Sequence, residues 1–190
     1  MLTVYLDFKS PGAYLAMKPT LALVDRLSLA VAWQPFLTVE RDVPKLGKEE
    51  TVGESHRRVR AESQRRLAIK YAAHQGIELR FPATPGETDL ALGALAVIES
   101  DPLPYIQASF DAYWQAHADL NDEATIRQLI DQSGATISTE LSEVRDLLDA
   151  AQAQAEEAGI VGAPAYVISE QIFVGREHLP WIEEIARASD

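Results

Sequence analysis

The chain contains no cysteine among its 190 residues. It therefore forms no disulfide, has no C-x-x-C redox pair and offers no thiol nucleophile of its own. Soft-metal ligands are limited to four histidines, His56, His74, His117 and His178. These histidines show no close ligand spacing, so we expect no metal site. If the protein takes part in thiol chemistry, the sulfur arrives with a bound molecule.

Basic residues are scarce as well. The 17 lysines and arginines stand against 29 acidic residues, which leaves a formal net charge of -12 at pH 7. Phosphate contacts supply much of the affinity for nucleic acids, so this charge argues against a nucleic-acid partner. It leaves room for a small anionic ligand, because the local field at a site matters more than net charge.

A long uninterrupted apolar run is also missing. We therefore expect no membrane span and no signal peptide, and a cytoplasmic protein.

A serine-proline pair separates the first predicted strand from the first predicted helix. Residues 3–8 are apolar and β-prone. Ser10 is a favourable N-cap, and Pro11 at the first helical position gives up an N–H that would lack a partner there. The positive end of the helix dipole stabilises a thiolate, phosphate or carboxylate at Ser10. Taken alone, the pair favours a simpler interpretation as a good helix start.

A proline-led hairpin lies near the other end of the chain. Ala163-Pro164 opens an apolar run, and a short polar turn at 169–171 separates it from a second run that ends at Gly175. Proline is tolerated at the start of a strand. An X-Pro bond at such a tight entry is a candidate for the cis form.

The stretch between the two motifs has a helical pattern. We expect strands at 3–8 and 28–36, a loop at 37–54, a hairpin at 165–175, and helices at 11–27, 55–74, 88–99, 103–116, 122–132, 138–158 and 179–188. The candidate caps are Asn121 and Ser138 at helix starts, with Gly76, Gly134 and Gly159 past helix ends.

This order predicts an α/β protein with a thioredoxin-like fold. A β-α-β unit with parallel strands and a β-β-α unit flank a large all-helical insertion. We expect residues 1–54 and 159–190 to form the thioredoxin-like domain and residues 55–158 to form the inserted helical domain.

Both motifs resemble the same family. The sequences DFKSP at 7–11, YLA at 14–16 and GAP at 162–164 look like those of 2-hydroxychromene-2-carboxylate isomerases, which belong with kappa-class glutathione transferases in the DsbA-like thioredoxin superfamily. The resemblance covers nearly the whole chain, and Phe81-Pro82 fits a Phe-Pro turn of that family. It implies a DsbA-like fold and a glutathione-dependent isomerase or transferase. The implied substrate is an aromatic or polyketide-like small molecule, as in aromatic degradation.

The resemblance also implies a chemical role for Ser10. In that family the serine replaces the redox cysteine and holds the thiolate of glutathione. A helix N-terminus and a hydrogen-bond donor lower the pKa of a free thiol from roughly 8.5. The thiolate would add to an electron-poor double bond, permit rotation and leave again, which divides one hard step into two easier ones.

Further cofactor-binding residues follow from the same resemblance. Pro11 and Gly12 would supply backbone next to Ser10, and Ala163, ahead of Pro164, would pair with the peptide backbone of glutathione. Past the hairpin, Arg176 and Glu177 stand where the family binds the γ-glutamyl end of glutathione, and Glu177 can serve an ammonium group.

Three departures from the family pattern keep a second interpretation open. The family usually has a tyrosine where Gly12 stands, an asparagine-bearing loop within 37–54, and a serine or glutamine where Arg176 stands. These differences favour a catalytically silent DsbA-like module that binds a peptide or protein partner beside Pro164. The sequence leaves a homodimer open and does not identify the substrate.

Overall fold

The structure is a computed structural model that describes residues 1–39 and 51–188. The chain divides into two compact units, Met1–Thr38 with Arg80–Asp190, and Val39–Leu79. The division of the chain into a thioredoxin-like domain (1–54 and 159–190) and an inserted helical domain (55–158) stays a prediction.

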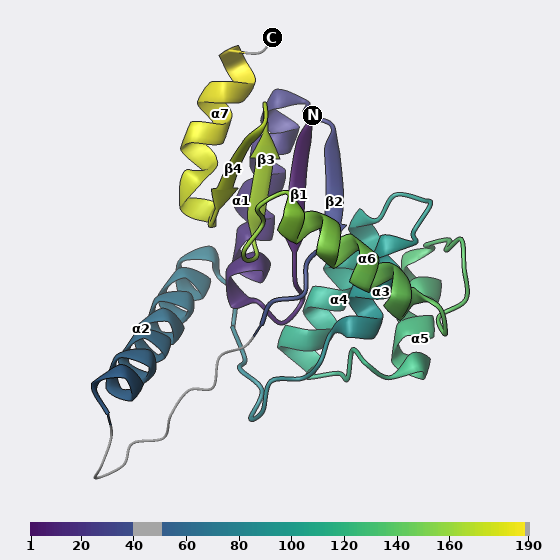
Figure 1. Cartoon of the computed structure of the whole chain (residues 1–190), viewed down its shortest axis with the longest axis horizontal. Coiled ribbons are helices and arrows are strands. Elements are labelled where there is room, and N and C mark those ends of the chain that lie inside the picture. The colour runs from purple at the N-terminus through teal and green to yellow at the C-terminus, as the bar shows by residue number, and fades with distance from the viewer. Residues whose placement is uncertain (40–50, 189–190) are drawn as a thin grey trace. The chain divides into compact units, whose positions relative to one another are not determined.

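The larger unit contains a mixed β-sheet (Figure 1). In the described residues its strands are β1 (Leu2–Leu6), β2 (Val31–Pro35), β3 (Ala165–Ile168) and β4 (Gln171–Val174), in the order β2-β1-β3-β4. Strand β1 pairs with β2 in parallel and with β3 antiparallel, and β3 pairs with β4 antiparallel. The predicted parallel β-α-β unit is therefore confirmed.

The helices of this unit follow the expected order. They are α1 (Pro11–Leu27), α3 (Asp89–Ala96), α4 (Leu103–Ala116), α5 (Glu123–Ser133), α6 (Val144–Glu157), the short 3-10 helix η1 (Arg176–His178) and α7 (Leu179–Ala188). A β-α-β unit and a β-β-α unit flank a run of helices, which confirms the predicted α/β, thioredoxin-like fold.

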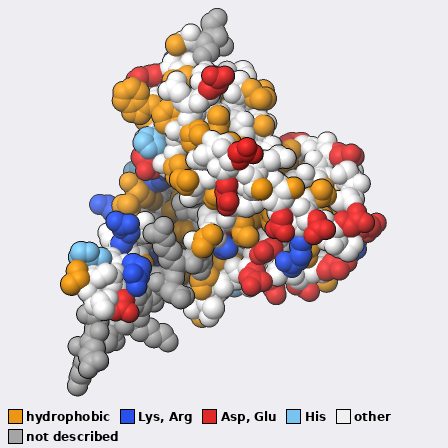
Figure 2. All heavy atoms as spheres, viewed as in Figure 1, with side chains coloured by type: hydrophobic (Ala, Val, Ile, Leu, Met, Phe, Trp, Pro, Cys, Tyr) orange, Lys and Arg blue, Asp and Glu red, His pale blue; other side chains and the backbone are white. Residues whose placement is uncertain are grey.

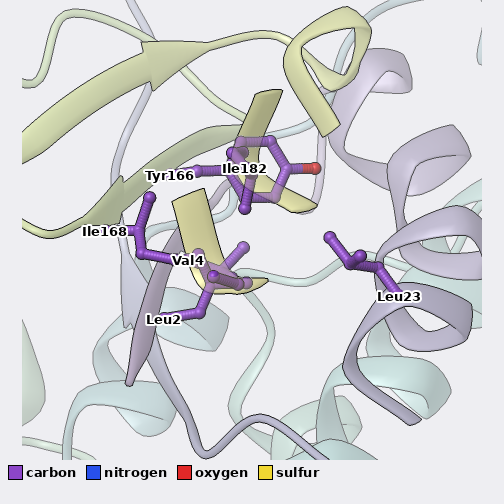
Figure 3. Packing of buried hydrophobic residues seen from close by; sticks show 7 residues of the cluster. Leu2, Val4, Leu23, Tyr166, Ile168 and Ile182 are labelled. Atoms are coloured by element: carbon purple, nitrogen blue, oxygen red, sulfur yellow. The ribbon is translucent and has the colours of Figure 1, made fainter. Parts of the chain in front are cut away.

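One face of the sheet packs against α1 and α7. Leu2, Val4, Tyr166 and Ile168 project from the strands toward Leu23 of α1 and Ile182 of α7 (Figure 3), and all six side chains are buried. The alternation of buried residues in β1 produces this face, since side chains at every second position point the same way. The opposite face packs a smaller cluster of Phe36, Ala155, Ile160 and Ala165.

Several predicted boundaries were wrong, two because of local capping and one because of a contact between residues distant in sequence. Ser28 adopts a left-handed conformation as the C-cap of α1, so β2 begins at Val31 rather than at 28. The helix predicted from 138 begins at Val144, because the N–H and the hydroxyl of Ser138 both donate to the carbonyl oxygen of Val97. The cap of α5 is Asp122 rather than Asn121.

The smaller unit contains α2 (Val52–Gln75). Thr51 and Glu54 form a reciprocal capping box at its start, so the helix begins earlier than the predicted residue 55. Gly76 caps its end in the left-handed conformation, as predicted. The predicted loop at 37–54 falls mainly on residues 40–50, which lie outside the described residues.

Candidate functional site

Ser10 lies at the junction of β1 and α1 and caps the helix. Its backbone is extended, with φ -77° and ψ 114°, and its Oγ accepts a hydrogen bond from the N–H of Ala13 at 3.2 Å. Pro11 occupies the first helical position, as predicted. The serine oxygen is therefore held at the positive end of a 17-residue helix, where a negative charge is stabilised.

The two sequence motifs meet at this junction. The peptide bond between Ala163 and Pro164 is cis, and the hydroxyl of Ser10 donates to the carbonyl oxygen of Ala163 at 2.9 Å across 153 residues of sequence. A Cβ placed on Gly12 would lie 3.4 Å from Cδ of Pro164 and 3.5 Å from Oγ of Ser10. Ser10, Pro11, Gly12, Ala163 and Pro164 thus form one cluster, which we call the Ser10 site.

The Ser10 site offers two backbone donors. Within the part of the chain that the structure describes, the N–H groups of Gly12 and Ala163 have no hydrogen-bond acceptor. A polar group without a partner at a partly exposed site is available to a ligand. Gly12 lies in the first turn of α1, and Ala163 precedes the cis-proline. The two donors belong to the two chain segments that the Ser10–Ala163 hydrogen bond joins.

The other two predicted site residues lie on the turn that follows β4. Gly175, which precedes Arg176 and Glu177, has φ of 102° and donates its N–H to the carbonyl oxygen of Pro164 at 2.8 Å. The Glu177 carboxylate folds back over Gly175, since a Cβ there would clash with Oε2 of Glu177. Pro164 therefore connects this turn to the Ser10 site through one backbone bond.

A buried carboxylate below Ser10 was not anticipated. The Asp7 side chain is 0% exposed and accepts hydrogen bonds from the N–H and hydroxyl of Thr38, at 2.8 and 2.5 Å, and from the hydroxyl of Thr88 at 2.8 Å. The N–H of Lys9 donates to it at 3.2 Å, and Lys9 Nζ lies 3.9 Å away. The carbonyl oxygen of Asp7 accepts from the N–H of Ser10. Asp7 thus fixes the junction that carries Ser10.

Three aromatic side chains pack together beside the Ser10 junction: Tyr14 of α1 and Phe81 are partly exposed, and Trp114 of α4 is buried. Tyr14 stacks on Trp114, with ring centroids 6.0 Å apart, and Phe81 meets the same indole edge-on. The indole N–H of Trp114 donates to the carbonyl oxygen of Phe8 at 2.9 Å. Burial raises the pKa of Tyr14, so its hydroxyl is neutral near pH 7 and donates to Asp111. We call Tyr14, Phe81 and Trp114 the aromatic wall.

The described residues contain neither a metal-binding cluster nor a membrane-spanning helix. No group of three or more His, Asp or Glu side chains is placed there to hold a metal ion. No helix within 1–39 and 51–188 has both the length and the apolar character for a bilayer crossing.

The fold and the site define a thioredoxin-like protein in which a serine caps the helix next to the cis-proline. The profile of the DsbA-like thioredoxin domain matches residues 1–185, and the chain belongs to that family. A 2-hydroxychromene-2-carboxylate isomerase from Sphingobium xenophagum is 26% identical over 188 residues, which cover 94% of each chain.

Solved structures agree on the fold. A 2-hydroxychromene-2-carboxylate isomerase superposes with a TM-score of 0.72 at 18% identity, covering 99% of this chain and 95% of that one. A cytosolic disulfide reductase from Pseudomonas aeruginosa, solved with GSH, has a TM-score of 0.59 at 15% identity, covering 99% and 96%. The predicted family resemblance is confirmed.

Proposed function

We propose that this protein binds glutathione at the Ser10 site and uses its thiolate to isomerise or conjugate an aromatic small molecule. The observation that carries the proposal is the Ser10–Ala163 contact at the start of α1, in a chain without cysteine. A hydroxyl at that position holds a thiolate without being consumed. The isomerase relative supports an isomerisation, and the disulfide reductase solved with GSH supports glutathione binding on this fold.

Ser10 has one hydroxyl proton, and the proposal requires that proton to change its acceptor. In the ligand-free structure the proton is donated to the carbonyl oxygen of Ala163. When the thiolate arrives, the hydroxyl rotates toward sulfur, and the Ala163 carbonyl is released to accept an amide N–H of glutathione. The Ala163 N–H pairs with a glutathione carbonyl at the same time. One rotation therefore exchanges an internal hydrogen bond for several bonds to the ligand.

Thiolate stabilisation comes from the helix and the hydroxyl together. A free thiol has a pKa of roughly 8.5, and a helix N-terminus lowers it. The free N–H of Gly12 and the hydroxyl of Ser10 add hydrogen bonds that favour the charged form. Glu177 would bind the ammonium group of the γ-glutamyl end, and Arg176 would bind its carboxylate.

The chemical step is a reversible addition. The thiolate forms a C–S bond to an electron-poor double bond conjugated with a carbonyl, and the π electrons move onto that carbonyl oxygen. The former double bond becomes single and rotates. The electrons then return, the C–S bond breaks and the thiolate is regenerated. Within the aromatic wall, the partly exposed rings of Tyr14 and Phe81 offer a surface on which an aromatic substrate can stack.

One observation favours a silent binding module instead. Val161, two residues before Ala163, is 81% exposed. An exposed aliphatic side chain next to free backbone groups is a typical anchor for an extended peptide. In that case the Ser10 site would bind a peptide and would carry out no chemistry.

Calorimetric titration with reduced glutathione distinguishes the two functions. Ser10→Ala should weaken binding by about tenfold to a hundredfold, because a hydrogen bond to a charged group contributes about 1.5–3 kcal/mol. Ser133→Ala is the matched control, since its hydroxyl also donates to a carbonyl oxygen at 2.9 Å, in α5. Absence of heat and of thermal shift with glutathione would reject the cofactor and leave the binding module.

A further inference from the structure

The Tyr14 side chain lies on the same face of α1 as Ser10. The N–H of Tyr14 donates to the carbonyl oxygen of Ser10 at 3.1 Å, so the two residues are separated by one helical turn. Helical side chains lean toward the N-terminus of their helix, and the phenol ring therefore extends back toward the turn that begins at Ser10. The ring is partly exposed, so a molecule bound at the Ser10 site can touch it.

Two side chains of α4 hold the hydroxyl of Tyr14. The hydroxyl donates to Oδ1 of Asp111 at 3.2 Å and accepts from Nε2 of Gln115 at 3.1 Å. The indole N–H of Trp114, next to Gln115, donates to the carbonyl oxygen of Phe8 and fixes α4 to the segment that leads into α1. Burial raises the pKa of Tyr14, so the phenol keeps its proton through the neutral pH range. The hydroxyl is thus a fixed and protonated donor.

The proposed reaction places a negative charge on the substrate and needs such a donor. When the thiolate forms a C–S bond to the β-carbon of an enone, the π electrons move to the carbonyl oxygen. The chain has a net charge of -12, and Figure 2 shows carboxylates gathered over α5 and α6. An overall negative field does not favour a new oxyanion. A hydrogen-bond donor aimed at the oxygen supplies the stabilisation locally.

We propose that the Tyr14 hydroxyl contacts the carbonyl oxygen of the substrate and donates its hydrogen bond to the oxyanion that forms when the thiolate adds. This role rests on the proposed function. Tyr14 is then a catalytic residue, with Asp111 and Gln115 as positioning residues. The O–H turns from Asp111 to the substrate oxygen, and the exposed Asp111 carboxylate binds water in exchange. Gln115 continues to donate to the phenol oxygen, which strengthens the O–H as a donor.

The spacing of the two hydroxyls suits an enone. One helical turn advances about 5.4 Å, which is comparable with the span from the sulfur through the attacked carbon to the carbonyl oxygen. Ser10 holds the sulfur, and Tyr14 holds the oxygen. From the enolate, the electrons return and expel the thiolate to give the isomer, or the α-carbon takes a proton from water to give the conjugate. The arrangement therefore selects electrophiles whose carbonyl group is conjugated with the attacked carbon.

A pair of electrophiles tests this role. Benzylideneacetone is an aromatic enone that forms an enolate when glutathione adds, whereas chlorodinitrobenzene loses chloride and forms none. Tyr14→Phe keeps the ring and should lower kcat/KM for benzylideneacetone, relative to that for chlorodinitrobenzene, by about tenfold to a hundredfold, because one hydrogen bond to a charged oxygen is lost.

Tyr105→Phe is the matched control for the loss of a phenol hydroxyl. The Tyr105 hydroxyl donates to the carbonyl oxygen of Ala91 at 3.0 Å, and the side chain is fully buried, so it cannot touch a substrate. The ratio of the two kcat/KM values in Tyr105→Phe should match that of the unmodified protein. An unchanged ratio in Tyr14→Phe, an equal fall in both variants, or no acceleration of the enone reaction by a protein that binds glutathione would overturn the role of Tyr14.

Calorimetric titration with reduced glutathione separates this role from the proposed function. Tyr14 contacts the electrophile and not the thiol, so Tyr14→Phe should retain the glutathione affinity of the unmodified protein. If the unmodified protein binds no glutathione, the proposed function is wrong and the role of Tyr14 is rejected with it. If both proteins bind glutathione and react equally fast with benzylideneacetone, the role of Tyr14 alone is wrong.

Discussion

Replacing Asp7 by asparagine is expected to destabilise the larger unit strongly. The Asp7 carboxylate is fully buried and accepts four hydrogen bonds, from Lys9, Thr88 and twice from Thr38. These donors come from the end of β1, from the segment after β2 and from the start of α3. An amide has a single acceptor oxygen, so its NH₂ group must face at least one buried N–H donor.

The magnitude follows from the donors that lose their acceptor. The hydroxyls of Thr38 and Thr88 can rotate to accept from the new NH₂ group, whereas the backbone N–H of Lys9 or Thr38 cannot. One backbone donor is therefore left unsatisfied, and the charge assistance of the remaining bonds is lost. A hydrogen bond to a charged group contributes about 1.5–3 kcal/mol, and an unsatisfied buried group costs a similar amount. We expect Asp7→Asn to lower the free energy of unfolding by about 3 kcal/mol.

Urea unfolding followed by circular dichroism measures this loss. Asp149→Asn is the matched control, because Asp149 lies exposed on α6 and should change stability by no more than about 0.5 kcal/mol. If both substitutions shift the urea midpoint equally, the buried network does not hold the junction and the reasoning is refuted.

Two further predictions concern burial and packing. Burial is the chief cause that raises the pKa of Tyr166 to about 12. The neutral phenol therefore contributes about 2–3 kcal/mol to the free energy of unfolding below pH 10, and this contribution is lost as the pH rises toward 12. Tyr166→Phe should flatten the pH profile of unfolding, and an unchanged profile would refute this. Gly93→Ala should cost about 2 kcal/mol in thermal or urea unfolding, because its Cβ would lie 2.8 Å from Val144. Gly53→Ala, with its nearest neighbour at 3.7 Å, should be neutral or stabilising, and equal effects would contradict the packing argument.

Elements with strong local signals could be predicted from the sequence. Helices α1, α4 and α7 begin and end where the sequence indicated, since Pro11, Ser10 and the apolar periodicity act within one or two turns. The region 138–143 could not be predicted as non-helical. Its structure depends on hydrogen bonds from Ser138 to Val97, some 40 residues away, which override a locally helical sequence.

The candidate site divides in the same way. Ser10 and Pro164 were recognisable from their own motifs, but the 2.9 Å bond that joins them forms only in the folded chain. Asp7 gave one usable signal, an acidic residue directly after an apolar strand. Its burial depends on Thr38 and Thr88, whose positions next to Asp7 no local pattern reveals. The contributions of Arg176 and Glu177 to cofactor binding stay predictions.

The most direct test of the central claim is the pKa of the glutathione thiol in the complex, measured from the ultraviolet absorbance of the thiolate as pH is varied. We expect the bound thiol to ionise well below the free value of roughly 8.5. In Ser10→Ala the bound thiol should ionise at a higher pH, because the hydroxyl no longer stabilises the thiolate, while Ser133→Ala should match the unmodified protein. An unshifted thiol pKa, or the same pKa with and without the Ser10 hydroxyl, would contradict the account.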